Sequence, residues 1–200
     1  MGLFGKLFGG KSKGSKNEPP KFSNFTSSDA LMDEDQFWEV IKTTFTKSDN
    51  NFKRQQEELA KHLRNLTPEE IISFANRFRF FRGQANTWDL WGAIYIIHGG
   101  CGDDSFSDFR EWVIGQGKDF YVKTINDPES LVDVETKRIE ATEWEGLGYV
   151  PSTVFEELTG QEMPHPYEEK LETTGHEWQE GGNDLKKMFP KLHAKYHAHG

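Results

Sequence analysis

The residues best suited to chemistry lie together between His98 and Asp104, in the run His-Gly-Gly-Cys-Gly-Asp-Asp. A thiol becomes a nucleophile when an imidazole accepts its proton, so His98 and Cys101 are a candidate nucleophile and base. A helix N-terminus after the turn would stabilise a thiolate or bind an anion, and Arg110 lies one helix further on. We favour a structural interpretation, in which glycines shape a turn, Cys101 is a small buried residue, and Arg110 pairs with an aspartate.

Two further groups carry ligand-type side chains. Asp103 and Asp104 are a carboxylate pair, but neighbouring acids point apart, so a shared metal would need help from Asp89 or Glu111. At the other end of the chain lie three histidines, His193, His197 and His199, of which the first two have the four-residue spacing of helical metal ligands. That helix lacks the glutamate of a metalloprotease motif and lies at a terminus, so we expect at most weak, adventitious metal binding there. We predict no metal site and no cofactor for the protein.

Trp88 and Trp91 are three residues apart and share one helix face. Large aromatic side chains line pockets and anchor interfaces, although a core position is the interpretation we favour. The sequence contains no glycine-rich phosphate loop, nucleophile elbow or dinucleotide fingerprint. Catalysis therefore stays an open question at this point.

Helices must position these residues. The run Trp88 to Ile97 is apolar at nearly every position, which predicts a central helix buried on all sides; a strand over residues 93–97 is the alternative. Gly99-Gly100 would end this helix, and Asp104 or Ser105 would cap the next one. Upstream, Thr67-Pro68-Glu69-Glu70 is a strong helix start. With apolar residues at helical spacing in most other segments, we predict a mainly α, compact, multi-helix single domain.

The chain divides by composition into three parts. Residues 1–31 form a Gly/Lys-rich flexible tail, residues 32–160 a helical domain, and residues 161–200 an irregular polar extension that packs on the domain and ends in a short helix. The tail repeats a Leu-Phe pair at residues 3–4 and 7–8, which could touch a membrane surface. No run is long and apolar enough for a transmembrane segment.

Charge restricts the partners. The 200-residue chain carries a net charge of −9, which argues against nucleic acid, and its first 21 residues are basic, so the remainder is still more acidic. An acidic body suits a basic protein partner, although solubility alone also explains it. Cys101 is the single cysteine, so no internal disulfide forms, which fits the cytoplasm.

The central motif resembles a bacterial family known as domain of unknown function 4240. The resemblance rests on Trp88-Asp89-Leu90-Trp91-Gly92-Ala93, then Gly99-Gly100-Cys101 with Asp103-Asp104, and finally Phe109-Arg110-Glu111-Trp112 with Gln116-Gly117. It extends from Met32 to Tyr196, through Phe37-Trp38, Tyr149, Phe155 to Gly160, and Phe189-Pro190. It implies a helical bacterial domain and no assigned activity. His98 stands where the family pattern has a polar residue such as asparagine, which argues against a family-wide catalytic histidine.

We therefore expect a cytoplasmic bacterial binding or interaction module without catalysis, of which an immunity-type protein that neutralises a basic toxin is one form. The alternative is a hydrolase or transferase that uses the turn His98 to Asp104. The candidate functional residues common to these hypotheses are Trp88, Asp89, Trp91, His98, Cys101, Asp103, Asp104 and Arg110.

Overall fold

Helices make up the regular structure of the residues that this computed structural model describes, which are 21–139, 145–181 and 183–197. The Leu-Phe repeat of the first residues and His199 lie outside them. Within this part there are ten α-helices and no β-strand, so the prediction of a mainly α fold is confirmed. In order they are α1 (Glu34–Ser48), α2 (Phe52–Leu63), α3 (Pro68–Gln84), α4 (Trp88–His98), α5 (Asp103–Gly115), α6 (Lys118–Asn126), a 3₁₀ helix η2 (Pro128–Asp133), α7 (Thr136–Ile139), α8 (Val150–Thr159), α9 (Asp184–Met188) and α10 (Pro190–Tyr196).

The predicted ends of α3 and α4 are confirmed. Thr67 caps α3 in a capping box, since its hydroxyl accepts from the Glu70 N–H while the Glu70 carboxylate accepts from the Thr67 N–H. The α4 helix begins after Thr87, whose hydroxyl accepts from the Leu90 N–H, and ends at Gly99 with φ +67°. Only glycine adopts that left-handed conformation without steric cost, which explains the glycine after His98.

The predicted start of α5 is wrong. Neither Asp104 nor Ser105 caps this helix, because its N-cap is Gly102, two residues before Asp104, and no side chain caps it. Asp103 and Asp104 instead occupy the first helical turn, where carboxylates interact favourably with the positive end of the helix dipole.

Aromatic side chains fill the core between α1, α3 and α6. The Phe37, Trp38, Phe81 and Tyr121 rings contact one another with centroids 4.6–5.4 Å apart. The Tyr121 hydroxyl donates to the Phe81 carbonyl at 2.8 Å, so this buried polar tip is satisfied. This packing joins α1, α3 and α6.

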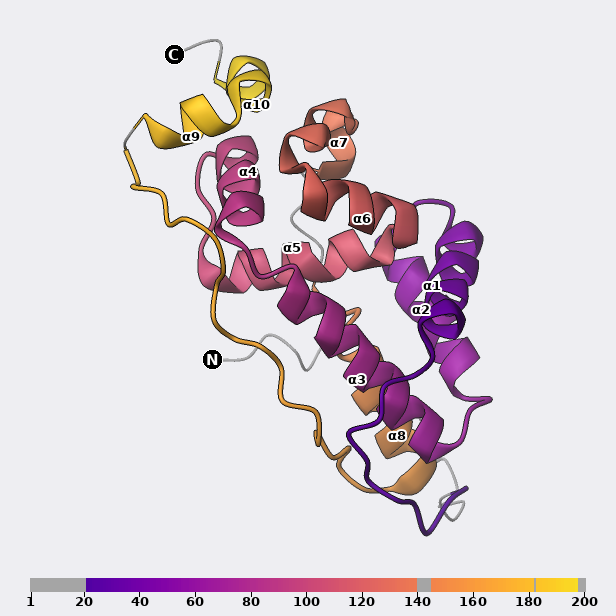
Figure 1. Cartoon of the computed structure of the whole chain (residues 1–200). Coiled ribbons are helices and arrows are strands. Elements are labelled where there is room, and N and C mark those ends of the chain that lie inside the picture. Colours follow the sequence, from indigo (N-terminus) through magenta and orange to yellow (C-terminus); the bar gives the residue numbers. More distant parts are fainter. Residues whose placement is uncertain (1–20, 140–144, 182, 198–200) are drawn as a thin grey trace, which may run out of the picture.

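The two ends of α3 contact different parts of the chain (Figure 1). Its N-terminal half lies against α8 and its C-terminal half approaches α5, while α4 packs between α5 and the C-terminal helices α9 and α10. Leu90, Ala93 and Ile94 of α4 are fully buried. The helix is not buried on all sides as predicted, because Asp89 is exposed and Trp91 is half-buried.

Residues 161–181, here called the arm, run from α8 along α3 to α4 (Figure 1). They contain no helix and form one isolated parallel bridge, between Thr174 and Thr87. Beyond the arm, the expected single C-terminal helix is split into α9 and α10 at Phe189-Pro190, because proline has no N–H to continue the first helix.

Packing at the N-terminal side begins before Met32. The Phe25 ring meets Phe155 of α8 edge-on at 4.8 Å, and Asn76 of α3 donates to the Ser28 and Ala30 carbonyls. None of the described helices has the length and hydropathy needed to cross a bilayer.

Candidate functional site

In the turn after α4, the His98 and Cys101 side chains contact different backbone carbonyls. The His98 Nε2 lies 2.9 Å from the Ile139 carbonyl oxygen, so this imidazole contacts the end of α7. The Cys101 thiol lies 3.7 Å from the Gly102 carbonyl oxygen. Burial raises the pKa of this thiol to about 11, so it is protonated at neutral pH. A nucleophilic cysteine needs the opposite shift.

Asp89, Asp103 and Asp104 are all exposed, the first on α4 and the other two at the start of α5. Each lies in the first turn of its helix, which accounts for its contribution to stability. The ion pairs found among the described residues include none of these three carboxylates. Their negative charge is therefore directed to solvent.

An aromatic ladder connects α4, α5 and the arm. Trp88 and Trp91 stack with centroids 5.2 Å apart and planes 7° apart, and Trp91 stacks on Phe106 at 4.8 Å. Trp178 of the arm meets Trp88 edge-on at 6.0 Å. The Trp91 indole N–H also donates to the Cys101 carbonyl at 2.8 Å, which ties the turn to the ladder. The sequence-based expectation of a shared face for Trp88 and Trp91 agrees with this geometry.

Arg110 does not pair with an aspartate of the turn, as the sequence suggested. Its guanidinium lies 5.0 Å from the centre of the Phe106 ring, and its Nη1 donates to the Arg82 carbonyl at 3.1 Å. Its Nε is buried without a hydrogen-bond partner in the described part of the chain. Burial and the neighbouring Arg82 lower its pKa. The side chain thus ends the ladder and faces a second cluster of charges.

That second group, here called the charge cluster, consists of Arg82, Glu111 and Glu169. It is not among the sites predicted from the sequence. Arg82 Nε and Nη2 donate to the two oxygens of Glu169 at 2.8 and 2.5 Å, and Nη1 donates to Glu111 Oε1 at 2.7 Å. Glu111 Oε2 accepts from the Gly148 N–H at 2.8 Å. The side chains of Glu111 and Glu169 are 4% and 8% exposed, so α3, α5 and the arm meet at a buried ion triad.

The electrostatics of the charge cluster follow from its burial. Burial alone lowers the pKa of the Arg82 guanidinium, but Glu169 and Glu111 outweigh it, and the pKa stands above its usual value. Burial raises the pKa of Glu111 against the opposing effects of Arg82 and the Gly148 N–H. Since both Glu111 oxygens accept hydrogen bonds, its geometry is that of a carboxylate.

Acidic side chains surround the outer side of this cluster. Burial, Glu111 and Glu145 together raise the pKa of Asp108 to about 6. Burial and Glu111 also raise the pKa of Tyr149, which is 59% exposed. A signal for the cluster does exist in the sequence: Arg110 and Glu111 interrupt the otherwise apolar run Phe109 to Ile114, and Arg82 interrupts the apolar face of α3.

Two of the C-terminal histidines, His193 and His197, lie side by side as their four-residue spacing predicts, although only His193 is within α10. Because α10 ends at Tyr196, His197 lies beyond it, and its Nε2 is 2.9 Å from the Ile96 carbonyl oxygen. The His193 and His197 rings are 5.1 Å apart. In the part of the chain that is described, no three His, Cys, Asp or Glu side chains gather in a way that could hold a metal ion.

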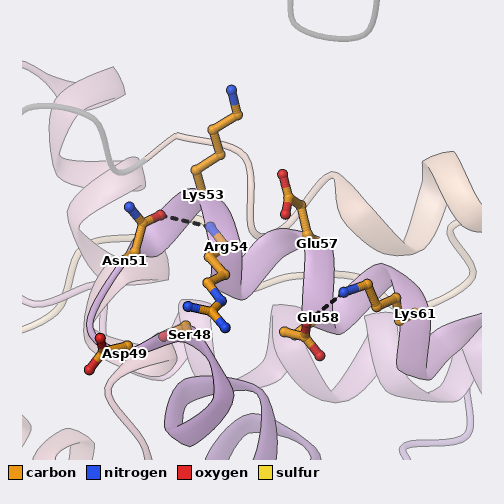
Figure 2. A pocket seen from close by; sticks show the side chains of 8 residues that line it. All are labelled: Ser48, Asp49, Asn51, Lys53, Arg54, Glu57, Glu58 and Lys61. Atoms are coloured by element: carbon orange, nitrogen blue, oxygen red, sulfur yellow. Dashed lines mark hydrogen bonds and ion pairs between the residues drawn. The ribbon is translucent and has the colours of Figure 1, made fainter.

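A hollow of about 480 Å³ lies where α1 turns into α2 (Figure 2). Its lining is polar and mixed in charge, and consists of Ser48, Asp49, Asn51, Lys53, Arg54, Glu57, Glu58 and Lys61. Asn51 caps α2 by accepting from the Arg54 N–H, and Lys61 pairs with Glu58 at 2.6 Å. These contacts stabilise α2, and none of the residues predicted as functional lines this hollow.

The fold and these clusters define a mainly α domain in which the aromatic ladder and the buried ion triad are neighbours on α5. Residues 32–157 match the family described as Protein of unknown function (DUF4240), so the chain belongs to that family. The match begins where the sequence suggested and ends before the arm, so the expected similarity at Phe189-Pro190 lies outside it. A comparison with curated proteins finds no match, and neither does a comparison with solved structures.

Proposed function

We propose that this protein is a cytoplasmic bacterial binding module without catalysis, and that its ligand is a basic protein. The proposal rests on five residues in the first turns of α4 and α5, here called the acidic-aromatic face: Trp88, Asp89, Trp91, Asp103 and Asp104. This face combines half-buried stacked indoles with exposed carboxylates. An immunity-type protein that neutralises a basic toxin is the specific form that we favour.

The chemistry of the face supports this ligand class. Tryptophan is enriched among the residues that dominate binding energy, because a large rigid ring buries much area at little entropic cost. Carboxylates around such an anchor attract a basic partner and accelerate its association. The net charge of −9 also attracts a basic partner over a longer range.

The alternative, a hydrolase or transferase at the turn His98 to Asp104, finds less support. A thiol with a pKa near 11 is a poor nucleophile at neutral pH. Asp103 and Asp104 are exposed, where water screens a charge that catalysis would need to concentrate. A non-catalytic role requires neither a reactive thiolate nor a shielded carboxylate.

Matched charge variants test the proposal. The face variant carries Asp89→Asn, Asp103→Asn and Asp104→Asn, and the control carries Glu39→Gln, Glu57→Gln and Glu156→Gln, which removes the same charge from exposed positions elsewhere. Each full chain is used to capture partners from a lysate of the source organism at two salt concentrations. We expect a stoichiometric basic protein with wild type and control, and at least about tenfold less with the face variant.

Two results would contradict the proposal. One is equal recovery of the partner by the face variant and the control, because the acids would then be irrelevant to binding. The other is the recovery of no stoichiometric basic protein by the wild type. Turnover of a substrate that is lost in Cys101→Ala, with folding intact, would instead favour the enzymatic alternative.

A further inference from the structure

The arm contacts α3 and α4 as a bound peptide contacts its receptor. The Thr174 N–H donates to the Asn86 carbonyl at 3.0 Å, and the Trp88 N–H donates to the Thr174 carbonyl at 2.9 Å. The Asn86 side-chain amide donates to the Leu171 carbonyl at 2.9 Å. Main-chain hydrogen bonds to an extended segment are the usual basis of peptide affinity, with side chains adding specificity.

Two side chains anchor the arm. Glu169 occupies the Arg82 fork with both of its oxygens, which is the bidentate geometry by which arginine recognises a carboxylate. Trp178 donates from its indole N–H to the Trp88 carbonyl at 3.0 Å and contacts the Tyr95 ring at 4.8 Å. Between the anchors, Leu171 is 82% exposed, so this stretch buries little apolar surface.

The helices beneath the arm are shaped to receive it. A Cβ added at Gly83 would lie 3.3 Å from the Lys170 backbone nitrogen and oxygen. One at Gly92 would lie 2.6 Å from Leu185 Cδ2 of α9 and 3.0 Å from the Trp178 indole nitrogen. Glycine weakens a helix, so the close approach of the arm explains Gly83, and the approach of α9 together with Trp178 of the arm explains Gly92. Residues 79–92 belong to the family match, whereas the arm lies beyond it.

We propose that the groove formed by Arg82, Gly83, Asn86, Trp88 and Gly92 is a binding site for an extended acidic peptide, and that the arm is its tethered occupant. The ligand presents a glutamate to Arg82, main-chain groups to Asn86 and an aromatic side chain to Trp88. The buried Nε of Arg110, which has no partner among the described residues, adds a donor beside this anion site. The proposal does not depend on the basic partner, since the two surfaces share only Trp88 and their ligands have opposite charge.

The binding test uses a fluorescent synthetic peptide with the sequence of residues 163–181. The receptor is the full chain with Glu169→Gln and Trp178→Ala, which removes both anchors of its own arm. We expect saturable binding to this opened chain and at least about tenfold weaker binding to the wild type, whose tethered arm competes at a high effective concentration. A peptide carrying the same two substitutions is the matched control, and should bind at least about tenfold more weakly.

A third receptor isolates the groove. Adding Gly83→Ala to the opened chain places a methyl group against the position of the Lys170 backbone, while alanine favours the helix itself. We expect weaker peptide binding with unchanged helix content by circular dichroism. Failure of the peptide to bind the folded opened chain, or equal binding of the control peptide, would overturn the proposal.

If the opened chain does not fold, hydrogen exchange on the wild type tests whether the arm leaves the groove without global unfolding. The amides of Trp88 and Thr174 are the donors between arm and groove. We expect both to exchange through local release of the arm, at least about tenfold faster than the amides in the middle of α3. Exchange of all these amides at one common, global rate would mean that the arm is an inseparable part of the core, and would refute an exchangeable ligand.

Discussion

Removing Arg82 is expected to destabilise the protein strongly, and by an amount that depends on pH. Arg82→Ala takes away the cation that bonds both Glu111 and Glu169, whose side chains are 4% and 8% exposed. Breaking a buried ion pair by removing one partner costs about 3–5 kcal/mol. Because two carboxylates lose their partner here, we expect about 4–5 kcal/mol at pH 7.5.

The pH dependence follows from the protonation of the remaining acids. In the variant, burial and the loss of Arg82 both favour protonated Glu111, so the folded state binds protons more tightly than the unfolded chain. A raised carboxyl pKa gives stability that is present at low pH and is lost as the pH rises through the folded-state value. The difference between wild type and variant should therefore shrink to about half at pH 4.5.

Urea unfolding followed by circular dichroism at pH 7.5 and 4.5 measures both effects. Arg64→Ala is the matched control, since it breaks the Arg64–Glu157 pair, whose side chains are 45% and 44% exposed. An exposed pair contributes little, so the control should lose about 0.5 kcal/mol or less at either pH. Equal losses for Arg82→Ala and Arg64→Ala, or a loss at Arg82 that does not change with pH, would refute a buried, ionised triad.

Three other measurements probe the surrounding residues. Asp108→Asn should raise the free energy of unfolding by about 1 kcal/mol at pH 7.5, after allowance for solvent screening, and by almost nothing at pH 4. The reason is that the pKa of Asp108 is raised to about 6, so its unfavourable charge is present only above that pH. A variant that is less stable than wild type at pH 7.5 would contradict this. Iodoacetamide should alkylate Cys101 at least about tenfold more slowly in the folded than in the urea-unfolded chain, since its pKa is raised to about 11, and equal rates would show a reactive thiolate. Trp91→Ala should lower the free energy of unfolding in urea by about 2–3 kcal/mol, less than for a fully buried tryptophan. Trp91→Phe should lower it by about 1 kcal/mol, through the lost hydrogen bond to the Cys101 carbonyl. A larger loss for Trp91→Phe than for Trp91→Ala would contradict the stacking of Trp91 in the ladder.

Local signals made much of the fold predictable. The start of α3 depends on Thr67, Pro68 and Glu70, which are neighbours in sequence, so the pattern alone specifies the capping box. The end of α4 depends on the conformation of Gly99, which is likewise local. The start of α5 was misjudged because aspartate favours both the cap and the first turn of a helix, and only the path of the chain out of the preceding turn decides between them.

Local sequence patterns do not predict the charge cluster. Arg82 and Glu169 are 87 residues apart in sequence, and Arg82 and Glu111 are 29 apart, so no spacing rule connects them. Arg110 was misassigned for the same reason: the turn offered aspartates close by in sequence, whereas packing directs its guanidinium to Phe106 and the Arg82 carbonyl. Helical periodicity identifies which residues face inward, but it does not say which buried charge meets which.

Trp88 belongs to both proposed binding surfaces, the acidic-aromatic face and the peptide groove. Substitutions that test the two surfaces separately must therefore lie elsewhere. The Trp88 ring stacks on Trp91 in the acidic-aromatic face, while its backbone N–H and carbonyl bond Thr174 and Trp178 of the arm. A substitution at Trp88 would weaken both surfaces and could not tell them apart. The carboxylates at the start of α5 are free of arm contacts in the hydrogen bonds and ion pairs of the described residues, and Gly83 has no side chain to contribute to the face. Charge changes at Asp103 and Asp104 therefore act on the basic-partner proposal alone, and Gly83→Ala acts on the peptide groove alone.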